Sequence, residues 1–226
     1  MTAPIPLLIV GAGGFARETA QAVHAVNDAG PAWELLGHLD DDPARHGTVV
    51  DGVPVLGPAA LAAARTDARL VVCTGSPRDY ASRARIVARL GLPPERYATV
   101  VHPGASVARS CSLGPGTVVL AQAVLTAAVT VGAHVAVMPH VTLTHDDVVG
   151  DFATLAAGVR LAGGVHVEPG AYLGAGALVR ESRTIGAGAL VGMGSVVTRD
   201  VPAGQVWAGV PARFLRPAPD PTGVPQ

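Results

Sequence analysis

The sequence predicts two domains in series, an α/β domain followed by an all-β parallel β-helix. Two observations carry this prediction: apolar runs alternate with helical patterns in the first hundred residues, and a six-residue aliphatic repeat fills the second half of the chain. The composition agrees, because 49% of the 226 residues are hydrophobic, only 4% are aromatic, and Gly numbers 28. Such a chain suits a core of stacked aliphatic side chains joined by tight turns.

The repeat predicts the β-helix. Every sixth residue from Val101 to Val197 is Leu, Ile or Val, which makes 17 positions without a break in phase. Each hexad supplies a short strand and a corner, and three hexads complete a coil. A β-sandwich would instead show period-two strands and loops of varied length. Glycines that directly follow the aliphatic residue predict turns with positive φ: Gly114, Gly132, Gly150, Gly174, Gly186 and Gly192.

The first hundred residues predict a small parallel Rossmann-like domain. Strands are expected at 5–10, 33–39, 53–57, 70–75 and 97–101, with helices between them. The segment from Gly11 to Ala16 matches G-x-G-x-x-A after a strand and before a helix, an arrangement that directs backbone N–H groups at a diphosphate. Close packing alone could also require these glycines, and the domain is only half of a full dinucleotide fold.

Composition argues against several classes of function. The formal net charge of −1 gives no reason to expect a nucleic-acid or membrane partner. All 16 basic residues are Arg, which excludes a P-loop lysine and Schiff-base chemistry. Cys73 and Cys111 cannot build a disulfide framework and predict buried thiols in a reducing compartment. The first strand is too short for a secretion signal or a membrane span.

The order of motifs resembles a known family. GAGGFARE, GHLDDD, VPVLG, VVCTGSP, VHPGASVA, HDDVVGDF and WAGVPAR are similar to the NeuD/PglD-type sugar acyltransferases over residues 5–216. The resemblance implies left-handed coils, a nucleotide-sugar domain at 1–100, an acyltransferase β-helix at 101–200, and a tail at 201–226 with the GVPAR motif and a flexible end. It also implies a cytoplasmic homotrimer that uses acetyl-CoA for N- or O-acylation of a nucleotide-linked sugar, with the site between subunits.

The same resemblance implies the roles of individual residues. His145 matches the general base and Asp146 the carboxylate that orients it, although Asp147 remains an alternative for that orienting role. A neutral imidazole can take the proton of an attacking amine or hydroxyl, and a carboxylate selects its tautomer. The implied nucleotide-sugar contacts are Gly13, Gly14, Phe15, Asp40, Asp41 and Gly75. The implied acyl-CoA contacts are Thr154, Gly163, Ala175 and Met193, with Gly163 at the oxyanion-donor position; no metal is implied.

Three alternatives stay open at this point. A non-catalytic nucleotide-sugar scaffold would bind the same ligands without turnover, and an NAD-dependent oxidoreductase would use the same glycine turn. A β-helix carbonic anhydrase would need histidine ligands from neighbouring subunits. His134, His140 and His166 keep that third alternative open, although we expect all three at surface or interface positions.

Overall fold

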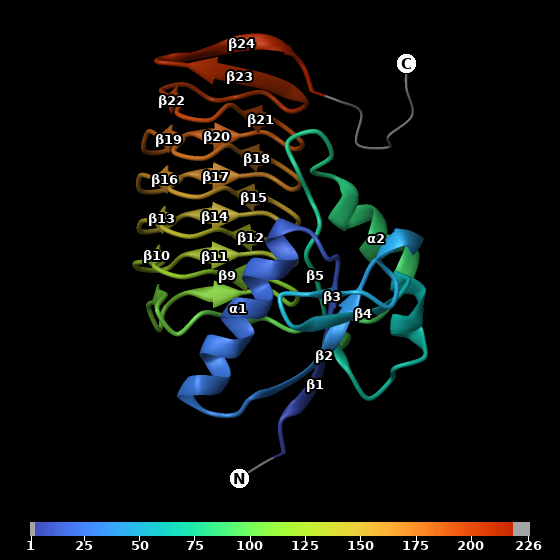
Figure 1. Ribbon diagram of the computed structural model, residues 1–226. Helices are drawn as coiled ribbons and strands as arrows, with labels where there is room; N and C mark the ends of the chain where they lie inside the picture. The colour runs from blue at the N-terminus through green and yellow to red at the C-terminus, as the bar shows by residue number, and fades with distance from the viewer. Residues whose placement is uncertain (1–2, 219–226) are drawn as a thin grey trace.

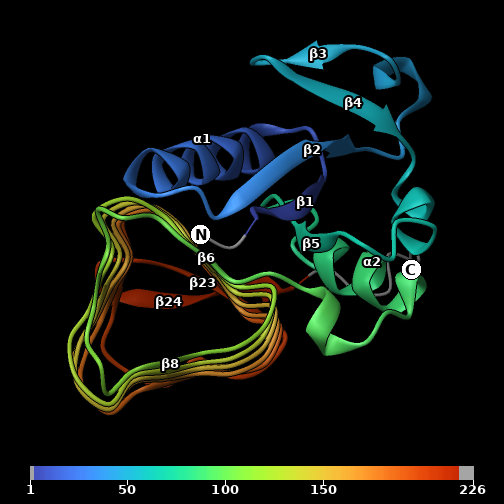
Figure 2. The ribbon, with the colours of Figure 1, turned by 90° about the horizontal axis from the view of Figure 1, so that it is seen from below.

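The computed structural model describes residues 3–218, so the flexible end expected for the last residues lies outside the described part. An α/β domain lies beside a tall triangular β-helix, and the chain runs up the β-helix from its lower end (Figure 1). Seen along the β-helix axis, the α/β domain covers one face of the triangle (Figure 2).

The N-terminal domain is a five-stranded sheet with strand order β3-β4-β2-β1-β5, parallel except for β3. The chain places β2 and β4 on one side of β1 and then crosses to place β5 on the other. The carboxyl ends of β1 and β5 therefore form the topological switch point, where α/β sheets commonly bind ligands. The bounds are β1 Ile5–Val10, α1 Gly14–Ala29, β2 Trp33–Leu39, β3 Val49–Val50, β4 Val53–Gly57, β5 Arg69–Val72 and α2 Ser82–Leu90, with 3₁₀ turns at Pro43–Arg45, Ala59–Ala63 and Pro94–Arg96.

The β-helix has three sheets, whose two-residue strands pair in parallel with the strand 18 residues away. The first sheet contains β6 (Val100–Val101), β9 (Val118–Val119), β12 (Ala136–Val137), β15 (Thr154–Leu155), β18 (Tyr172–Leu173), β21 (Leu190–Val191), β23 (Gln205–Gly209) and the antiparallel β24 (Ala212–Pro217). The second contains β7 (Ser106–Val107), β10 (Val124–Leu125), β13 (Thr142–Leu143), β16 (Arg160–Leu161), β19 (Leu178–Val179) and β22 (Val196–Val197). The third contains β8 (Ser112–Leu113), β11 (Thr130–Val131), β14 (Val148–Val149), β17 (His166–Val167) and β20 (Thr184–Ile185).

The six-residue aliphatic series is the inward series of this β-helix. Every member from Val119 to Val197 is at most 3% exposed and belongs to one continuous core. Burial of each such side chain contributes about 1.5–3 kcal/mol to folding, so these repeated aliphatic residues are the main source of stability of the β-helix. The strand expected at 97–101 divides between the domains, because Tyr97 bridges to β5 whereas Val100 pairs with Val118 of the β-helix.

The predicted reason for the repeated glycines is wrong. The residues with positive φ lie three positions after the aliphatic residue, at Gly116, Gly158 and Gly164, and also at non-glycine residues such as His134 and Asp146. The glycines directly after the aliphatic residue are needed for space instead. A Cβ on Gly114 would lie 2.5 Å from the carbonyl carbon of Gly132 in the next coil. Stacking of coils at the corners therefore excludes a side chain there.

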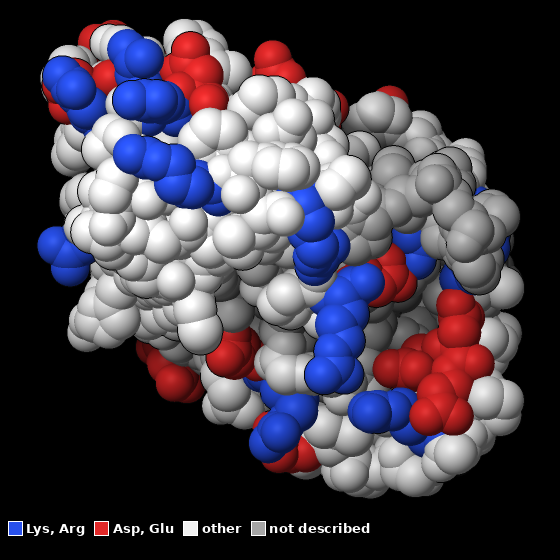
Figure 3. Space-filling view, turned by 90° about the horizontal axis from the view of Figure 1, so that it is seen from above, with Lys and Arg blue, Asp and Glu red and all other residues white. Residues whose placement is uncertain are grey.

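The upper end of the β-helix is closed by the β23–β24 hairpin. Phe214 and Leu215 of β24 are 50% and 61% exposed. Seen from above, a broad uncharged area is bordered by basic and acidic side chains that lie close to one another (Figure 3).

Candidate active site

His145 lies on the corner between the second and third sheets, in the turn from β13 to β14. We call this edge of the prism the His145 corner; it includes residues 144–147 and, one coil later, 162–165. The Nδ1 atom of His145 lies 2.9 Å from the Asp146 carboxylate, and both side chains are more than two-thirds exposed. Asp146 has a φ of 63°, a left-handed conformation that Asp tolerates better than most residues. With the proton on Nδ1 facing Asp146, Nε2 carries the free lone pair.

Gly163 lies one coil beyond His145, directly against the imidazole. A Cβ at this position would overlap Cε1 and Nε2 of His145, so any larger residue would have to displace the ring from this position. The neighbouring Gly164 N–H donates to the carbonyl oxygen of His145 at 2.9 Å. Within residues 3–218, the Gly163 N–H makes no hydrogen bond. A free donor thus lies beside the nitrogen that would accept a proton.

Asp147 points into the β-helix core and does not contact the ring. Its side chain is fully buried and accepts hydrogen bonds from the N–H groups of Thr144 and Val165, each at 2.8 Å. Burial raises the pKa of Asp147 to about 6, partly offset by these two hydrogen bonds. Of the two carboxylates considered for orienting His145, Asp146 is the one in contact with Nδ1.

A second group of predicted residues lines a cleft between the two domains. Phe15, Gly75 and Thr154 lie around a space of about 110 Å³ together with side chains that the sequence did not single out. This space is smaller than the roughly 300 Å³ of ordinary ligand pockets, so it would hold only part of a nucleotide-linked sugar. The added lining residues are Thr74, Arg83, Ala136, Met138, Ala156, Ala157 and Tyr172.

The glycines of the β1–α1 turn serve different purposes. Gly11 has a φ of +106°, and a Cβ there would lie 2.7 Å from the carbonyl oxygen of Cys73, so the fold itself requires it. At Gly13 and Gly14 an added Cβ would meet no atom within 4 Å, and neither residue has a positive φ. Space remains open at the N-terminus of α1, where an anion would meet free N–H groups.

The acidic pair after β2 is occupied by contacts within the domain. Asp40 accepts from the Ala12 N–H at 2.9 Å and thereby holds the glycine turn. Asp41 accepts from the Ala59 N–H at 3.0 Å and pairs with Arg89. Both carboxylates therefore stabilise the α/β domain itself, whether or not they also contact a ligand.

Arg83 of α2 is the residue at this cleft that sequence reasoning missed. It is 1% exposed and donates to backbone carbonyls of both domains: Thr74 on one side, and His134, Phe152 and Ala153 on the other. It also donates to the Thr154 hydroxyl at 2.9 Å. Burial lowers the pKa of Arg83 to about 10, so it stays charged at neutral pH. The sequence of this helix is rich in Arg and is typical of an exposed helix, so it did not indicate which arginine would be buried.

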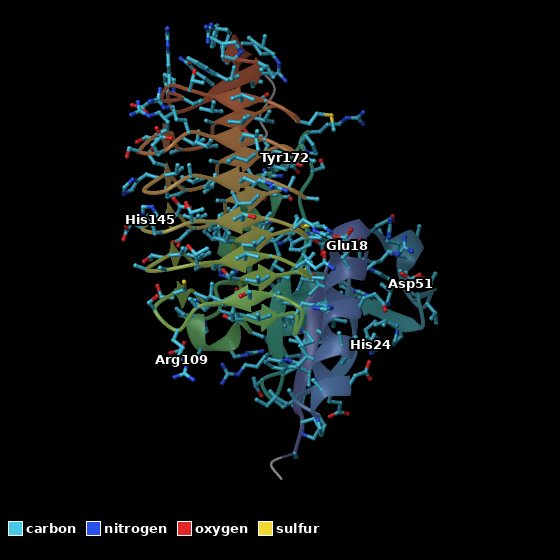
Figure 4. The ribbon with its side chains drawn as sticks, turned by 90° about the vertical axis from the view of Figure 1, so that its left-hand side faces the viewer. Glu18, His24, Asp51, Arg109, His145 and Tyr172 are labelled. Carbon is cyan, nitrogen blue, oxygen red and sulfur yellow. The ribbon has the colours of Figure 1, made fainter. Side chains whose placement is uncertain are left out.

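The remaining predicted acyl-CoA residues lie on the corner between the first and second sheets. Ala175 and Met193 follow β18 and β21 there, and Met193 is 77% exposed. Figure 4 shows His145 projecting on one side of the β-helix, while Tyr172, which lines the cleft, lies toward the side of the α/β domain. One chain therefore brings His145 to Asp146 and Gly163, and Phe15 to Gly75 and Thr154, but leaves the two groups apart.

His134, expected at a surface or interface position, is not at the surface of the chain. His134 is 5% exposed, stacks on Phe152 with ring centroids 5.0 Å apart, and meets Tyr97 edge-on at 4.5 Å. Burial and the nearby Arg83 lower the pKa of His134 to about 4. His140 and His166 are exposed.

The described residues contain no group of three or more His, Cys, Asp or Glu that could hold a metal ion. Among residues 3–218, no helix has the length and apolar character needed to span a bilayer.

Comparison with known proteins finds relatives that cover both domains. A family model, the PglD N-terminal domain, matches residues 6–90. The acetyltransferase domain of PglB from Neisseria gonorrhoeae FA1090, solved in complex with acetyl coenzyme A, is 29% identical with a TM-score of 0.82, over 94% of this chain and 100% of that chain. PerB from Caulobacter crescentus, solved with CoA and GDP-perosamine, is 31% identical with a TM-score of 0.81, over 92% of this chain and 96% of that chain.

A variant of the GDP-perosamine N-acetyl transferase from Caulobacter crescentus, in which one histidine is replaced by alanine, was also solved with CoA and GDP-perosamine. It is 30% identical with a TM-score of 0.80, over 92% of this chain and 96% of that chain. No curated protein sequence matches the chain. The matched structures bear out the predicted Rossmann-like domain and left-handed parallel β-helix.

Proposed function

The chain belongs to the PglD/NeuD-type sugar acyltransferases, and on this premise we propose that it transfers the acetyl group of acetyl-CoA to the amino group of a nucleotide-linked amino sugar. The observation that carries the proposal is the His145–Asp146 contact beside the free N–H of Gly163. The acetyl-CoA and GDP-perosamine complexes of the relatives support the choice of donor and acceptor class. We place the reaction in the cytoplasm, as the resemblance to this family implies.

His145 acts as the general base. The amine nitrogen attacks the thioester carbonyl carbon, and its proton passes to Nε2 of His145. The Gly163 N–H stabilises the oxyanion that forms on the carbonyl oxygen. The carbon–sulfur bond then breaks, and the CoA thiolate leaves with the proton that Nε2 of His145 had accepted, which returns the imidazole to its neutral form. Asp146 holds the Nδ1 proton and so keeps Nε2 available as the acceptor.

The acceptor and the base come from different copies of the chain in this proposal. The open turn at Gly13 and Gly14 and the cleft at Phe15 and Gly75 lie with the α/β domain. His145 lies on the corner opposite the sheet that this domain covers. A homotrimer, in which the α/β domain of one copy presents the sugar to the His145 corner of the next, would close the site.

The test measures thiol release from acetyl-CoA with GDP-perosamine and a panel of UDP- and dTDP-linked amino sugars. His145→Gln is expected to lower kcat by about 10²–10⁴, the usual contribution of a general base, and Asp146→Asn to lower it less. Acetyl-CoA binding by calorimetry should be unchanged in both variants. The histidine variant of the Caulobacter crescentus enzyme, solved with CoA and GDP-perosamine, is a precedent for retained binding.

Two outcomes would contradict the proposal. Near-full activity of His145→Gln at saturating acceptor would place the base elsewhere. A non-catalytic scaffold would be favoured if the unaltered protein bound both ligands but released no thiol with any acceptor of the panel.

A further inference from the structure

Asp147 is unusual among the residues that stack at its position. On the His145 corner, the equivalent positions of the other coils hold Cys111, Val129, Val165 and Arg183. Val129 and Val165 are buried apolar side chains that fill the corner without polar contacts. The only carboxylate of this series therefore lies in the one turn that carries His145 and Asp146.

The Asp147 carboxylate changes the hydrogen bonding of the His145 turn. In the coils before and after, the first N–H of the turn donates to the next coil: Thr126 to the Leu143 carbonyl at 3.1 Å, and Ala162 to the Val179 carbonyl at 3.0 Å. Thr144 instead donates its N–H to Asp147, and its hydroxyl donates to the Leu161 carbonyl at 3.0 Å. The backbone that leads into His145 is thus held by a side chain rather than by the coil-to-coil ladder.

The second carboxylate oxygen acts on the next turn. In many turns of the β-helix the last N–H closes onto the carbonyl three residues earlier, as Val159 does onto Ala156 at 3.2 Å. Val165 instead donates to Asp147 at 2.8 Å. Val165 ends the turn that contains Gly163. One buried carboxylate consequently joins the turn of the base to the turn of the oxyanion donor.

We propose that Asp147 is a positioning residue, which fixes the imidazole of His145 relative to the Gly163 N–H by tying the two turns together. This inference rests on the proposed roles of His145 and Gly163.

The charged or titratable groups facing Asp147 from its own turn are His145 and Asp146. The turns stacked directly before and after it, 126–129 and 162–165, contain none. The carboxylate thus has no cation to hold it and depends on the two N–H donors.

The two donors make the carboxylate hard to replace. Asn at this position can accept from one N–H, but its amide nitrogen would face the other donor. Val would pack as its counterparts on the neighbouring coils do, but would accept from neither. Misplacement of a catalytic group by about 1 Å can cost about 10²-fold in rate, so a small movement of either turn would be visible in kcat.

The experiment compares Asp147→Asn and Asp147→Val with a matched control, Thr117→Val. The Thr117 hydroxyl is also fully buried at an inward corner, donates to the Gly132 carbonyl at 2.8 Å and accepts from the Val135 N–H at 3.0 Å. It braces two coils as Asp147 does, but at another corner and away from His145. All variants are measured for thermal unfolding, for kcat and the KM of acetyl-CoA, and for the pH dependence of kcat.

Both Asp147 variants are expected to lower kcat by about 10–100-fold with less than about a twofold change in the KM of acetyl-CoA. Thr117→Val is expected to lose thermal stability while it retains kcat. Wild-type kcat in Asp147→Asn would overturn the inference and leave Asp147 a structural role. If Asp147→Val fails to fold, Asp147→Asn still decides the matter. His145→Gln separates the two proposals: full activity in that variant overturns both, whereas inactivity together with an unaffected Asp147→Asn overturns only the positioning role.

Discussion

Gly163 illustrates how a single missing Cβ supports the site. Gly163→Ala is expected to lower kcat by about 10–100-fold, because the new methyl group would occupy the place of the His145 ring. Its φ is not in the left-handed region, so the melting temperature should change little. The measurement is kcat alongside thermal unfolding.

Gly164→Ala is the matched control. Gly164 has a φ of +70°, and its added Cβ would meet nothing closer than the Ser182 hydroxyl at 3.7 Å. The variant should lose about 1–2 kcal/mol of stability from the left-handed backbone and keep its activity. The reverse pattern, with Gly163→Ala active and Gly164→Ala inactive, would show that the ring does not need this space.

The raised pKa of Asp147 leads us to expect that the stability of the protein depends on pH. The pKa of its carboxyl is about 6 in the folded chain and 3.8 in the reference state, so the folded chain binds the proton more tightly. Unfolding free energy therefore falls as pH rises from about 4 to above 6, and between pH 5 and 7.5 the loss is about 1.4 kcal/mol. Urea unfolding of the wild type and Asp147→Asn at both pH values isolates this contribution, because every other titrating group is shared. An equal pH effect in both proteins would contradict the prediction.

At the scale of elements, the β1–α1 turn contains one glycine that the fold requires, Gly11, and one that we propose contacts the ligand, Gly13. Gly13→Val is expected to leave thermal stability almost unchanged, because space is open at that position, and to abolish binding of nucleotide-linked sugars. Acetyl-CoA binding should survive. Calorimetry with GDP-perosamine, GDP and UDP, and separately with acetyl-CoA, is the measurement.

Gly11→Ala serves as the contrast, since its Cβ would press against the Cys73 carbonyl and its φ is positive. This variant should be destabilised and lose both ligands together. Equal loss of both ligands in Gly13→Val would indicate misfolding there as well and would remove the argument for an open phosphate site.

For the whole molecule, Arg83 joins the two domains, because it donates hydrogen bonds to backbone carbonyls of both. Arg83→Met is expected to cost about 2–4 kcal/mol, because it leaves buried carbonyls of both domains without a donor. It should also separate the unfolding of the α/β domain from that of the β-helix, which calorimetry and limited proteolysis can detect. Arg89→Met is the control, since its exposed pair with Asp41 is worth at most about 1 kcal/mol. A single cooperative transition with unchanged stability in Arg83→Met would contradict this role.

The proposed assembly predicts complementation between inactive variants. Light scattering should give three times the mass of one chain. Mixing unfolded His145→Gln and Gly13→Val chains in equal amounts and refolding them should restore about a quarter of wild-type activity, because that fraction of sites pairs an intact domain with an intact base from the next copy. No recovered activity, in a mixture shown to contain mixed trimers, would mean that both groups act within one chain.

Part of the candidate site could be predicted from the sequence because it is local. His145 and Asp146 are adjacent, and Gly163 lies 18 residues later, so the coil period alone places these three together. The same local pattern misled at the turns. The six-residue period identified the glycines that follow the aliphatic residues. It could not show whether glycine is needed there because coils stack closely or because φ is positive.

The sequence by itself determined the β-helix and its core, since a six-residue repeat leaves each aliphatic side chain one inward place and each coil one neighbour on either side. Only the tertiary structure decided that Arg83 is buried between the domains, that His134 is interior, and that the cleft and His145 lie on separate parts of one chain. The physical reason is range. Periodicity governs contacts at a fixed separation of 18 residues. Docking of the α/β domain instead brings Arg83 to His134 and Thr154, which are 51 and 71 positions away, and no repeat predicts such contacts.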